Sequence, residues 1–283
     1  MCVPGTFDAV GDDHHHHDEG VSRRSFLRAG GVVGAGVALA AGLPRPALAA
    51  LPAAPQRFVD LTHTFSDGFP VYPAFAPPRR VTLFRNGPPP DAYVNQWTFA
   101  EHSGTHVDVP SHFSAKGRNL DDISLEELIM PAVVLDISAR AANDADTTVS
   151  AADLREFEES VGRIPDGSAV LAYAGWDSRI HDGAKYLNFG PDGKMHAPGF
   201  SVEAADWLLS NRNVRCLGVD TISLDAASSI DYPVHRMWMP ADKLGLEVLA
   251  NLKALPPIGA TLVIGAIPFE KGSGGPGRIF AIV

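Results

Sequence analysis

Cysteine is nearly absent from this chain, and its scarcity excludes a disulfide framework. Of 283 residues only two are cysteine, Cys2 and Cys216. Cys2 lies in an N-terminal segment whose pattern predicts removal, so Cys216 has no second thiol to pair with. Cys216 stands in the run VRCLGVDTISL, which is typical of a buried strand. We therefore expect a small core side chain at this position rather than a nucleophile.

Basic residues are also in short supply. The chain has 23 Lys and Arg against 33 Asp and Glu, a formal net charge of −10 at pH 7. Nucleic acid binding requires a positively charged face, so we expect no nucleic acid partner. With 45% hydrophobic and 20% charged residues, the composition is that of an ordinary globular protein.

A long apolar run is missing as well. The best candidate, GGVVGAGVALAAGL at residues 30–43, is too short and too rich in glycine for a stable membrane anchor. It follows SRRSFLR at residues 22–28 and precedes Ala47-Leu48-Ala49. This arrangement resembles a twin-arginine export signal with a small-residue cleavage site. We expect a leader at 1–49, a single domain at 50–283, the twin-arginine export machinery as a partner, and a periplasmic or extracellular location.

Apolar runs rich in β-branched residues alternate with candidate helices through the rest of the chain. Serines at positions 124, 150 and 201 each precede acidic residues in the pattern of a helix N-cap. The alternation predicts an α/β fold. Residues 67–90, rich in proline and aromatics, predict a loop with a short strand that covers a pocket. The expected strands are 131–137, 168–176, 214–224, 260–267 and 278–283.

Three histidines and an aspartate gather in HSGTHVDVPSH at residues 102–112. A helix would place Asp108 about 200° around from His106, on the far side. In an extended chain His106 and Asp108 share a face and lie about 6.6 Å apart. A straight strand would hold His102 about 13 Å from His106, whereas a kink at Gly104 brings it close. The spacing therefore predicts a kinked strand that presents His102, His106 and Asp108 to one catalytic metal ion.

His112 follows Pro110 and falls beyond this strand. Two roles fit a histidine at that position. It supplies a fourth ligand, or it stands beside the metal as a general acid and base, because an imidazole titrates near neutral pH. Geometry from the sequence leaves both open.

The cluster resembles the H-x-G-T-H-x-D-x-P-x-H signature of the cyclase family of metal-dependent hydrolases, which includes bacterial kynurenine formamidases and isatin hydrolases. The resemblance continues through most of the chain beyond the leader. It covers residues 59–63, 217–221, 223, 225, 233–236, 252–256 and 272–278. It implies a swivelling β/β/α fold, with a mixed sheet and flanking helices, in a homodimer or homotetramer.

The resemblance also implies roles for individual residues. His102, His106 and Asp108 correspond to metal ligands, and His112 corresponds to the catalytic acid or base. Tyr72 stands where the formamidases carry a substrate-stacking tryptophan. His235 matches a histidine that holds a second metal ion in the dizinc formamidases.

One departure from the formamidase pattern bears on the number of metal ions. Where the formamidases have a bridging glutamate before Asn-Leu, this chain has Ala250. Glu247 lies three residues earlier, and it replaces that ligand only if the loop MWMPADKLG shifts the alignment with the formamidases. Otherwise the site holds a single manganese ion, as in isatin hydrolases, and His235 contacts substrate or water. The sequence favours one ion, and zinc and manganese remain open.

The resemblance implies hydrolysis of an amide C–N bond by metal-activated water. The first candidate substrate is an N-formyl aryl amine such as N-formylkynurenine. The alternative is a cyclic amide such as isatin. Tyr72, Phe65 and Trp97 are expected to form an apolar wall against an aromatic ring. A function of another class, a non-catalytic metal or small-ligand binding protein on the same scaffold, is also consistent with export.

Overall fold

The computed structural model describes residues 57–87 and 91–283. The predicted leader, 1–49, lies outside the described residues, as does the start of the predicted domain at residue 50. In the part of the chain that is described, no helix combines the length and apolar character needed to cross a bilayer.

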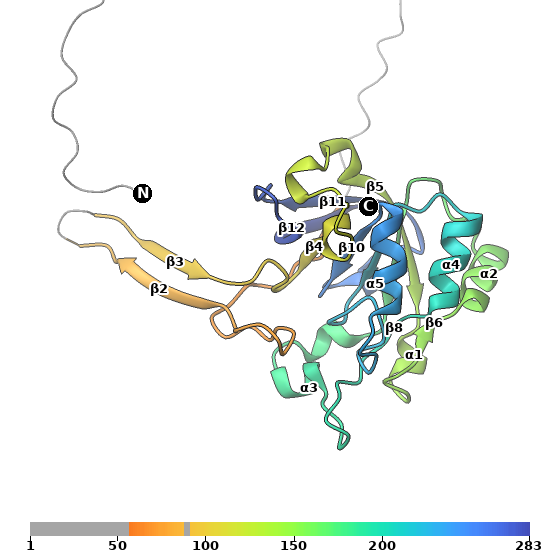
Figure 1. Ribbon diagram of the computed structural model, residues 1–283, viewed down its shortest axis with the longest axis horizontal. Coiled ribbons are helices and arrows are strands. Elements are labelled where there is room, and N and C mark those ends of the chain that lie inside the picture. The colour runs from red at the N-terminus through yellow and green to blue at the C-terminus, as the bar shows by residue number, and fades with distance from the viewer. Residues whose placement is uncertain (1–56, 88–90) are drawn as a thin grey trace, which may run out of the picture. The chain divides into compact units, whose positions relative to one another are not determined.

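A mixed eight-stranded sheet forms the centre of the fold (Figure 1), in the order β1-β12-β11-β5-β7-β9-β10-β4. A further pairing between β4 and β12 closes it into a barrel-like arrangement. The predicted α/β fold with a mixed sheet is confirmed. The strands of this sheet are β1 (Phe58–Asp60), β4 (His106–Asp108), β5 (Ile129–Asp136), β7 (Ala169–Tyr173), β9 (Cys216–Val219), β10 (Leu244–Glu247), β11 (Ile258–Ala266) and β12 (Gly274–Ile282).

The middle of the sheet is parallel, from β5 through β7 and β9 to β10. Parallel strands are covered on both faces, which explains why their sequences are almost continuously apolar. All four residues of β9 and of β10 are buried. Each of the five runs expected as a strand overlaps a strand of this sheet, with boundaries that differ by a few residues.

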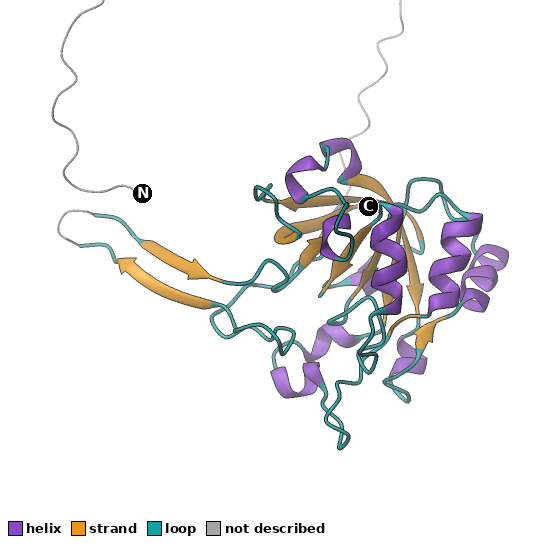
Figure 2. Ribbon diagram, viewed as in Figure 1, coloured by secondary structure: helices purple, strands orange, loops and turns teal. Residues whose placement is uncertain are grey.

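Helices cover one face of the sheet, and Figure 2 distinguishes them from the strands and loops. The α-helices are α1 (Ser138–Ala141), α2 (Ala151–Ser160), α3 (Gly183–Leu187), α4 (Val202–Asn211) and α5 (Pro233–Trp238). Short 3-10 helices are η1 (Pro110–His112), η2 (Leu120–Asp122), η3 (Leu125–Glu127), η4 (Trp176–Arg179), η5 (Met239–Ala241) and η6 (Leu252–Ala254).

Two of the three predicted N-caps begin α-helices. The Ser150 hydroxyl accepts the backbone N–H of Asp153 at the start of α2, and Ser201 accepts that of Ala204 in α4. Each bond satisfies one of the free N–H groups of the first turn. Ser124 also forms a capping box, but the turn it begins is the three-residue 3-10 helix η3 rather than an α-helix.

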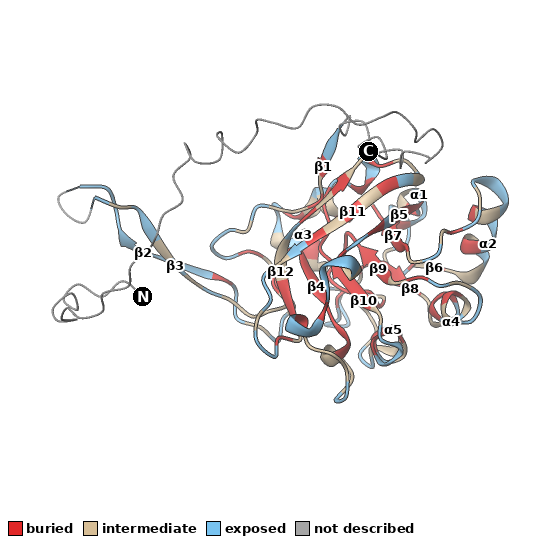
Figure 3. Ribbon diagram, turned by 90° about the horizontal axis from the view of Figure 1, so that it is seen from above, coloured by how far each residue is buried: buried red, intermediate tan, exposed pale blue. Residues whose placement is uncertain are grey.

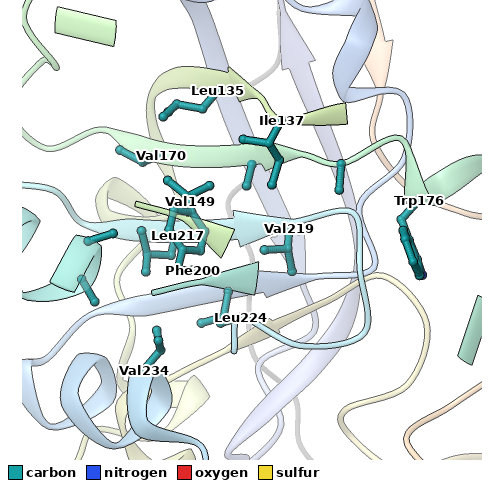
Figure 4. Close-up of a cluster of buried hydrophobic side chains, with 14 of the residues drawn as sticks. Leu135, Ile137, Val149, Val170, Trp176, Phe200, Leu217, Val219, Leu224 and Val234 are labelled. Carbon is teal, nitrogen blue, oxygen red and sulfur yellow. The ribbon is translucent and has the colours of Figure 1, made fainter. Parts of the chain in front are cut away.

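Two apolar clusters fill the interior, and Figure 3 shows the buried residues concentrated in the strands. Figure 4 shows the first cluster, in which Val170 and Leu217 from the sheet lie near Phe200 and Val234 from the covering layer. Burial of each large apolar side chain contributes roughly 1.5–3 kcal/mol. These contacts hold α5 against the sheet, and α5 carries His235. Phe200 belongs to β8 (Gly199–Phe200), which pairs with β6 (Thr148–Val149) in a separate two-stranded sheet.

A second two-stranded sheet, β2 (Arg79–Phe84) with β3 (Val94–Thr98), projects from the closed sheet (Figure 1). Every residue of β2 is exposed. Strand β2 lies within residues 67–90, where the sequence predicted a loop with a short strand. Apolar side chains are exposed along both strands and beside β3, namely Val81, Leu83, Phe84, Tyr93 and Val94.

Candidate metal centre

The kinked strand predicted from the spacing is present. His106 and Asp108 belong to β4, and their side chains leave the same face. Gly104 adopts a positive φ of 67°, a conformation that favours glycine, and a Cβ there would lie 2.5 Å from the Phe65 ring. The resulting bend returns His102 to the strand, with its Nδ1 2.7 Å from Asp108 Oδ1. His106 Nε2 lies 3.3 Å from the same oxygen.

Two residues distant in the sequence complete the cluster. Glu247, at the end of β10, is the direct cross-strand partner of His106 in the β10–β4 pairing. Its Oε1 lies 3.1 Å from Nε2 of His235, which α5 carries. Asp225 holds the other ring nitrogen of His235, with Oδ2 2.6 Å from Nδ1. The strand register therefore brings Glu247 to the cluster. The sequence disfavoured a second metal ion because Ala250 stands where the formamidases have a glutamate, and Glu247 supplies a carboxylate in its place.

Backbone and carboxylate partners leave one nitrogen of each central imidazole facing inward. His106 Nδ1 lies 2.8 Å from the carbonyl oxygen of Gly104, so its Nε2 faces Asp108. Among the residues that the structure describes, buried His106 Nε2 and Asp108 Oδ2 have no hydrogen-bond partner. Such unsatisfied atoms are rare in a protein interior and need a partner. A divalent metal ion satisfies both, and the donors of His102, His106 and Asp108 lie within 4.8 Å of one another.

The charges in the cluster favour a cation. Burial alone would lower the pKa of His106, but Asp108 and Glu247 outweigh it and raise the pKa to about 9. Burial alone would raise the pKa of Asp108, but the neighbouring imidazoles hold it well below its usual range. Both shifts have one origin, namely buried carboxylates that stabilise positive charge beside them. The same field stabilises a bound metal ion.

His112 lies at the end of η1, which follows strand β4. Its ring stacks on that of His102, with centroids 3.8 Å apart and planes at 24°. Burial lowers its pKa to about 3, so the imidazole is neutral and has a lone pair to accept a proton. Donor atoms of His112, Asp108 and His235 also lie within 4.8 Å of one another. Both predicted roles, ligand and base, remain compatible with this position.

A cavity of about 210 Å³ opens above the cluster. Its walls are largely aromatic. The lining residues are Tyr72, Ala74, Phe75, His102, His106, His112, Phe113, Ile222, Ser223, Tyr232, His235 and Glu247. The predicted pocket-covering loop therefore does line the cavity, through Tyr72 and its neighbours. The Tyr72 hydroxyl is hydrogen-bonded to that of Tyr232.

Phe113 and Tyr232 also line the cavity, although the sequence did not single them out. Both had a local signal, because Phe113 follows His112 directly and Tyr232 lies three residues before His235. The other two predicted wall residues are elsewhere. Phe65 contacts Trp97 with ring centroids 5.6 Å apart, and both line a separate cleft. They do not form the predicted wall in this cavity, because Phe65 packs over Gly104 instead.

Comparison with known proteins agrees with this geometry. Residues 59–226 match the Cyclase family. An isatin hydrolase of Roseibium aggregatum is 33% identical over 198 residues, which are 67% of this chain and 74% of that protein. A kynurenine formamidase of Salinibacter ruber is 25% identical over 173 residues, 60% of this chain and 72% of that protein.

A solved structure supports the same relationship. Isatin hydrolase A from Ralstonia solanacearum superposes with a TM-score of 0.76 at 37% identity, covering 80% of this chain and 91% of that one. The hydrolase relatives of this chain, together with the buried histidine–aspartate cluster beneath an aromatic cavity, identify a metal-dependent hydrolase. The chain belongs to the Cyclase family.

Residues 20–40 match a twin-arginine translocation signal. The protein is therefore exported across the membrane by the twin-arginine machinery, as predicted from the arginine pair. These residues lie outside those the structure describes.

Proposed function

We propose that this exported enzyme hydrolyses the amide C–N bond of a small aromatic substrate, and that a cyclic amide of the isatin type is its preferred class. The observation that carries the proposal is the aromatic cavity directly above the histidine–aspartate cluster. The greater identity to isatin hydrolases, 33% against 25% for the formamidase of Salinibacter ruber, supports the cyclic amide over the N-formyl amine.

His102, His106 and Asp108 would hold a divalent ion, zinc or manganese. When bound, such an ion acidifies water and polarises the scissile carbonyl. His112 accepts the proton that the attacking water loses and returns it to the leaving nitrogen. Its place in the cavity wall, with its ring against that of His102, supports this assignment. The Tyr72 ring contacts one face of the substrate in the same cavity.

We propose one ion per chain. His235 is held at Nδ1 by Asp225 and lies 3.1 Å from Glu247 through Nε2, whereas the nearest carboxylate oxygens lie 3.3 and 3.5 Å from His106 Nε2. The unsatisfied atoms thus favour the site formed by His102, His106 and Asp108. With one ion bound, the Nε2–H of His235 donates a hydrogen bond to substrate or water once its contact with Glu247 is broken.

A second candidate is a formamidase with two ions, and one observation favours it. Glu247 lies opposite His106 in the sheet and beside His235, in reach of the cluster as a bridging ligand would be. Metal titration separates the candidates, because two equivalents bound per chain would contradict the single-ion proposal.

The substrate proposal is tested by removing the metal from the purified protein and restoring manganese or zinc separately. Hydrolysis of isatin and of N-formylkynurenine is then followed side by side. Metal-dependent opening of isatin, faster than cleavage of N-formylkynurenine, is the expected result. The reverse preference would support the formamidase. Failure with both substrates, in protein shown to contain metal, would overturn the substrate class and favour the binding protein.

We also propose that the protein is a homodimer or homotetramer in which the β2–β3 hairpin contacts a second copy. The exposed apolar side chains of the hairpin support this proposal, because such residues are usually covered. Leu83→Ser should shift the mass measured by light scattering toward the monomer. Val161→Ser, at an exposed apolar residue after α2, should not. An unchanged mass for Leu83→Ser would contradict the role of the hairpin.

A further inference from the structure

Two side chains outside the proposed ligand set lie behind His102. Nε2 of His102 is 2.9 Å from the Ser273 hydroxyl oxygen. That hydroxyl donates to Glu101 Oε2 at 2.7 Å, and the backbone N–H of Ser273 donates to the same oxygen at 3.0 Å. A chain of hydrogen bonds therefore runs from the imidazole through the serine to a carboxylate.

The direction of this chain determines which nitrogen of His102 carries a proton. A carboxylate only accepts, and a serine hydroxyl has a single proton to donate. Since Ser273 gives its proton to Glu101, its oxygen accepts from His102, and Nε2 must be the protonated nitrogen. In the neutral ring the lone pair of Nδ1 then faces Asp108 Oδ1 at 2.7 Å. Two acceptors at that distance need a cation between them, either a proton on Nδ1 or a metal ion that replaces it.

The glycine-rich segment at 272–277 explains how Ser273 reaches this place. Its glycines satisfy G-x-G-x-x-G by spacing, but Gly274 begins strand β12 instead of opening a helix. A Cβ on Gly274 would lie 2.6 Å from the His102 ring and 2.5 Å from the carbonyl oxygen of Val107. The Ser273 carbonyl accepts the N–H of Val109, the residue after β4. The segment thus seats the His102 ring against β12.

His102 differs from His106 and His235 in which ring nitrogen its outer partner holds. His106 and His235 are held at Nδ1, by Gly104 O and by Asp225, and present Nε2 to the cluster. His102 is held at Nε2 and presents Nδ1. The partner of the outer nitrogen fixes the tautomer of a ligating histidine and its affinity for metal.

We propose that Ser273 and Glu101 are positioning residues that fix the Nε2-protonated tautomer of His102 and thereby strengthen metal binding at Nδ1. This inference rests on the proposed role of His102 as a ligand. It does not depend on which substrate the enzyme hydrolyses, because its readout is metal affinity.

The test measures the affinity of chelator-treated protein for manganese, and separately for zinc, by competition with a fluorescent chelator. Ser273→Ala should raise the metal Kd about 10- to 100-fold, the usual effect of removing an outer partner of a ligand. Ser273→Thr keeps the hydroxyl and should stay within about threefold of the parent protein. Ser178→Ala, an exposed serine outside the cavity, is the matched control and should change nothing.

A double-mutant cycle distinguishes positioning from general damage to the fold. Because Glu101 acts through Ser273, Glu101→Ala should weaken binding, but adding it to Ser273→Ala should have little further effect. Substrate KM should be unchanged in Ser273→Ala at saturating metal, and its turnover should recover as metal is added. Fully additive losses, or equal losses in Ser273→Thr, would overturn the inference.

His102→Ala separates this inference from the ligand assignment. If His102→Ala abolishes tight metal binding while Ser273→Ala keeps the parent affinity, the positioning role is wrong and the ligand stands. If His102→Ala keeps the parent affinity, the ligand assignment itself fails, and the inference fails with it.

Discussion

Replacing His112 with alanine is expected to lower kcat by about 100- to 10,000-fold while the protein keeps its metal. This is the usual contribution of a positioned acid and base. The expectation rests on the neutral His112 ring in the cavity wall, stacked on His102 but outside the cluster of His102, His106 and Asp108. Metal content by elemental analysis and turnover with the preferred substrate, measured on the same preparation, check it.

One result would contradict the role of His112 as acid and base. His112 also lies within ligand distance of Asp108 and His235, so loss of metal together with activity would make it a ligand. His196→Ala is the matched control, because that histidine is paired at the surface with Asp146 and Asp192. It should retain both metal and turnover.

Replacing Asp108 with asparagine is expected to abolish tight metal binding and turnover together. Asparagine preserves the size of the side chain but removes the charge that faces His102, His106 and His235. Loss of an outer partner alone costs 10- to 100-fold in affinity, so we expect a loss above about 100-fold for this central carboxylate. Calorimetric titration with manganese and with zinc measures the change.

A buried carboxylate elsewhere in the fold supplies the control for Asp108. Asp220 is fully buried and accepts the backbone N–H groups of Ala174 and Trp176, outside the cluster. Asp220→Asn should weaken the fold, measured by thermal unfolding, without changing metal affinity in the folded protein. Asp108→Asn that still binds metal as tightly as the parent protein would contradict the proposed centre.

The sequence predicted the part of this site that is local. His102, Gly104, His106 and Asp108 lie within seven residues, and strand geometry with one glycine was enough to place them together. The apolar runs predicted the buried strands for the same reason, because burial on both faces leaves a continuous signal. The twin-arginine signal was also predicted from the sequence, because it is a short linear pattern.

What escaped prediction depends on contacts between distant segments. Glu247 reaches His106 only through the pairing of β10 with β4, and Ser273 reaches His102 only because β12 pairs with the same strand. No local pattern encodes such a register. The wall assignment of Phe65 and Trp97 failed similarly, because aromatic content does not say toward which side of Gly104 a ring will turn. Residues 274–277 of the glycine-rich segment form the first part of β12.

The position of β4 in the closed sheet also sets an order of events during synthesis. The ribosome releases β4 long before β10 and β12, the two strands that flank it. Until they emerge, the histidines belong to an unfolded chain without a preformed site. The twin-arginine route carries proteins that have already folded. The ions available in the compartment of synthesis therefore have the first opportunity to fill the centre, before the enzyme reaches the compartment in which it works.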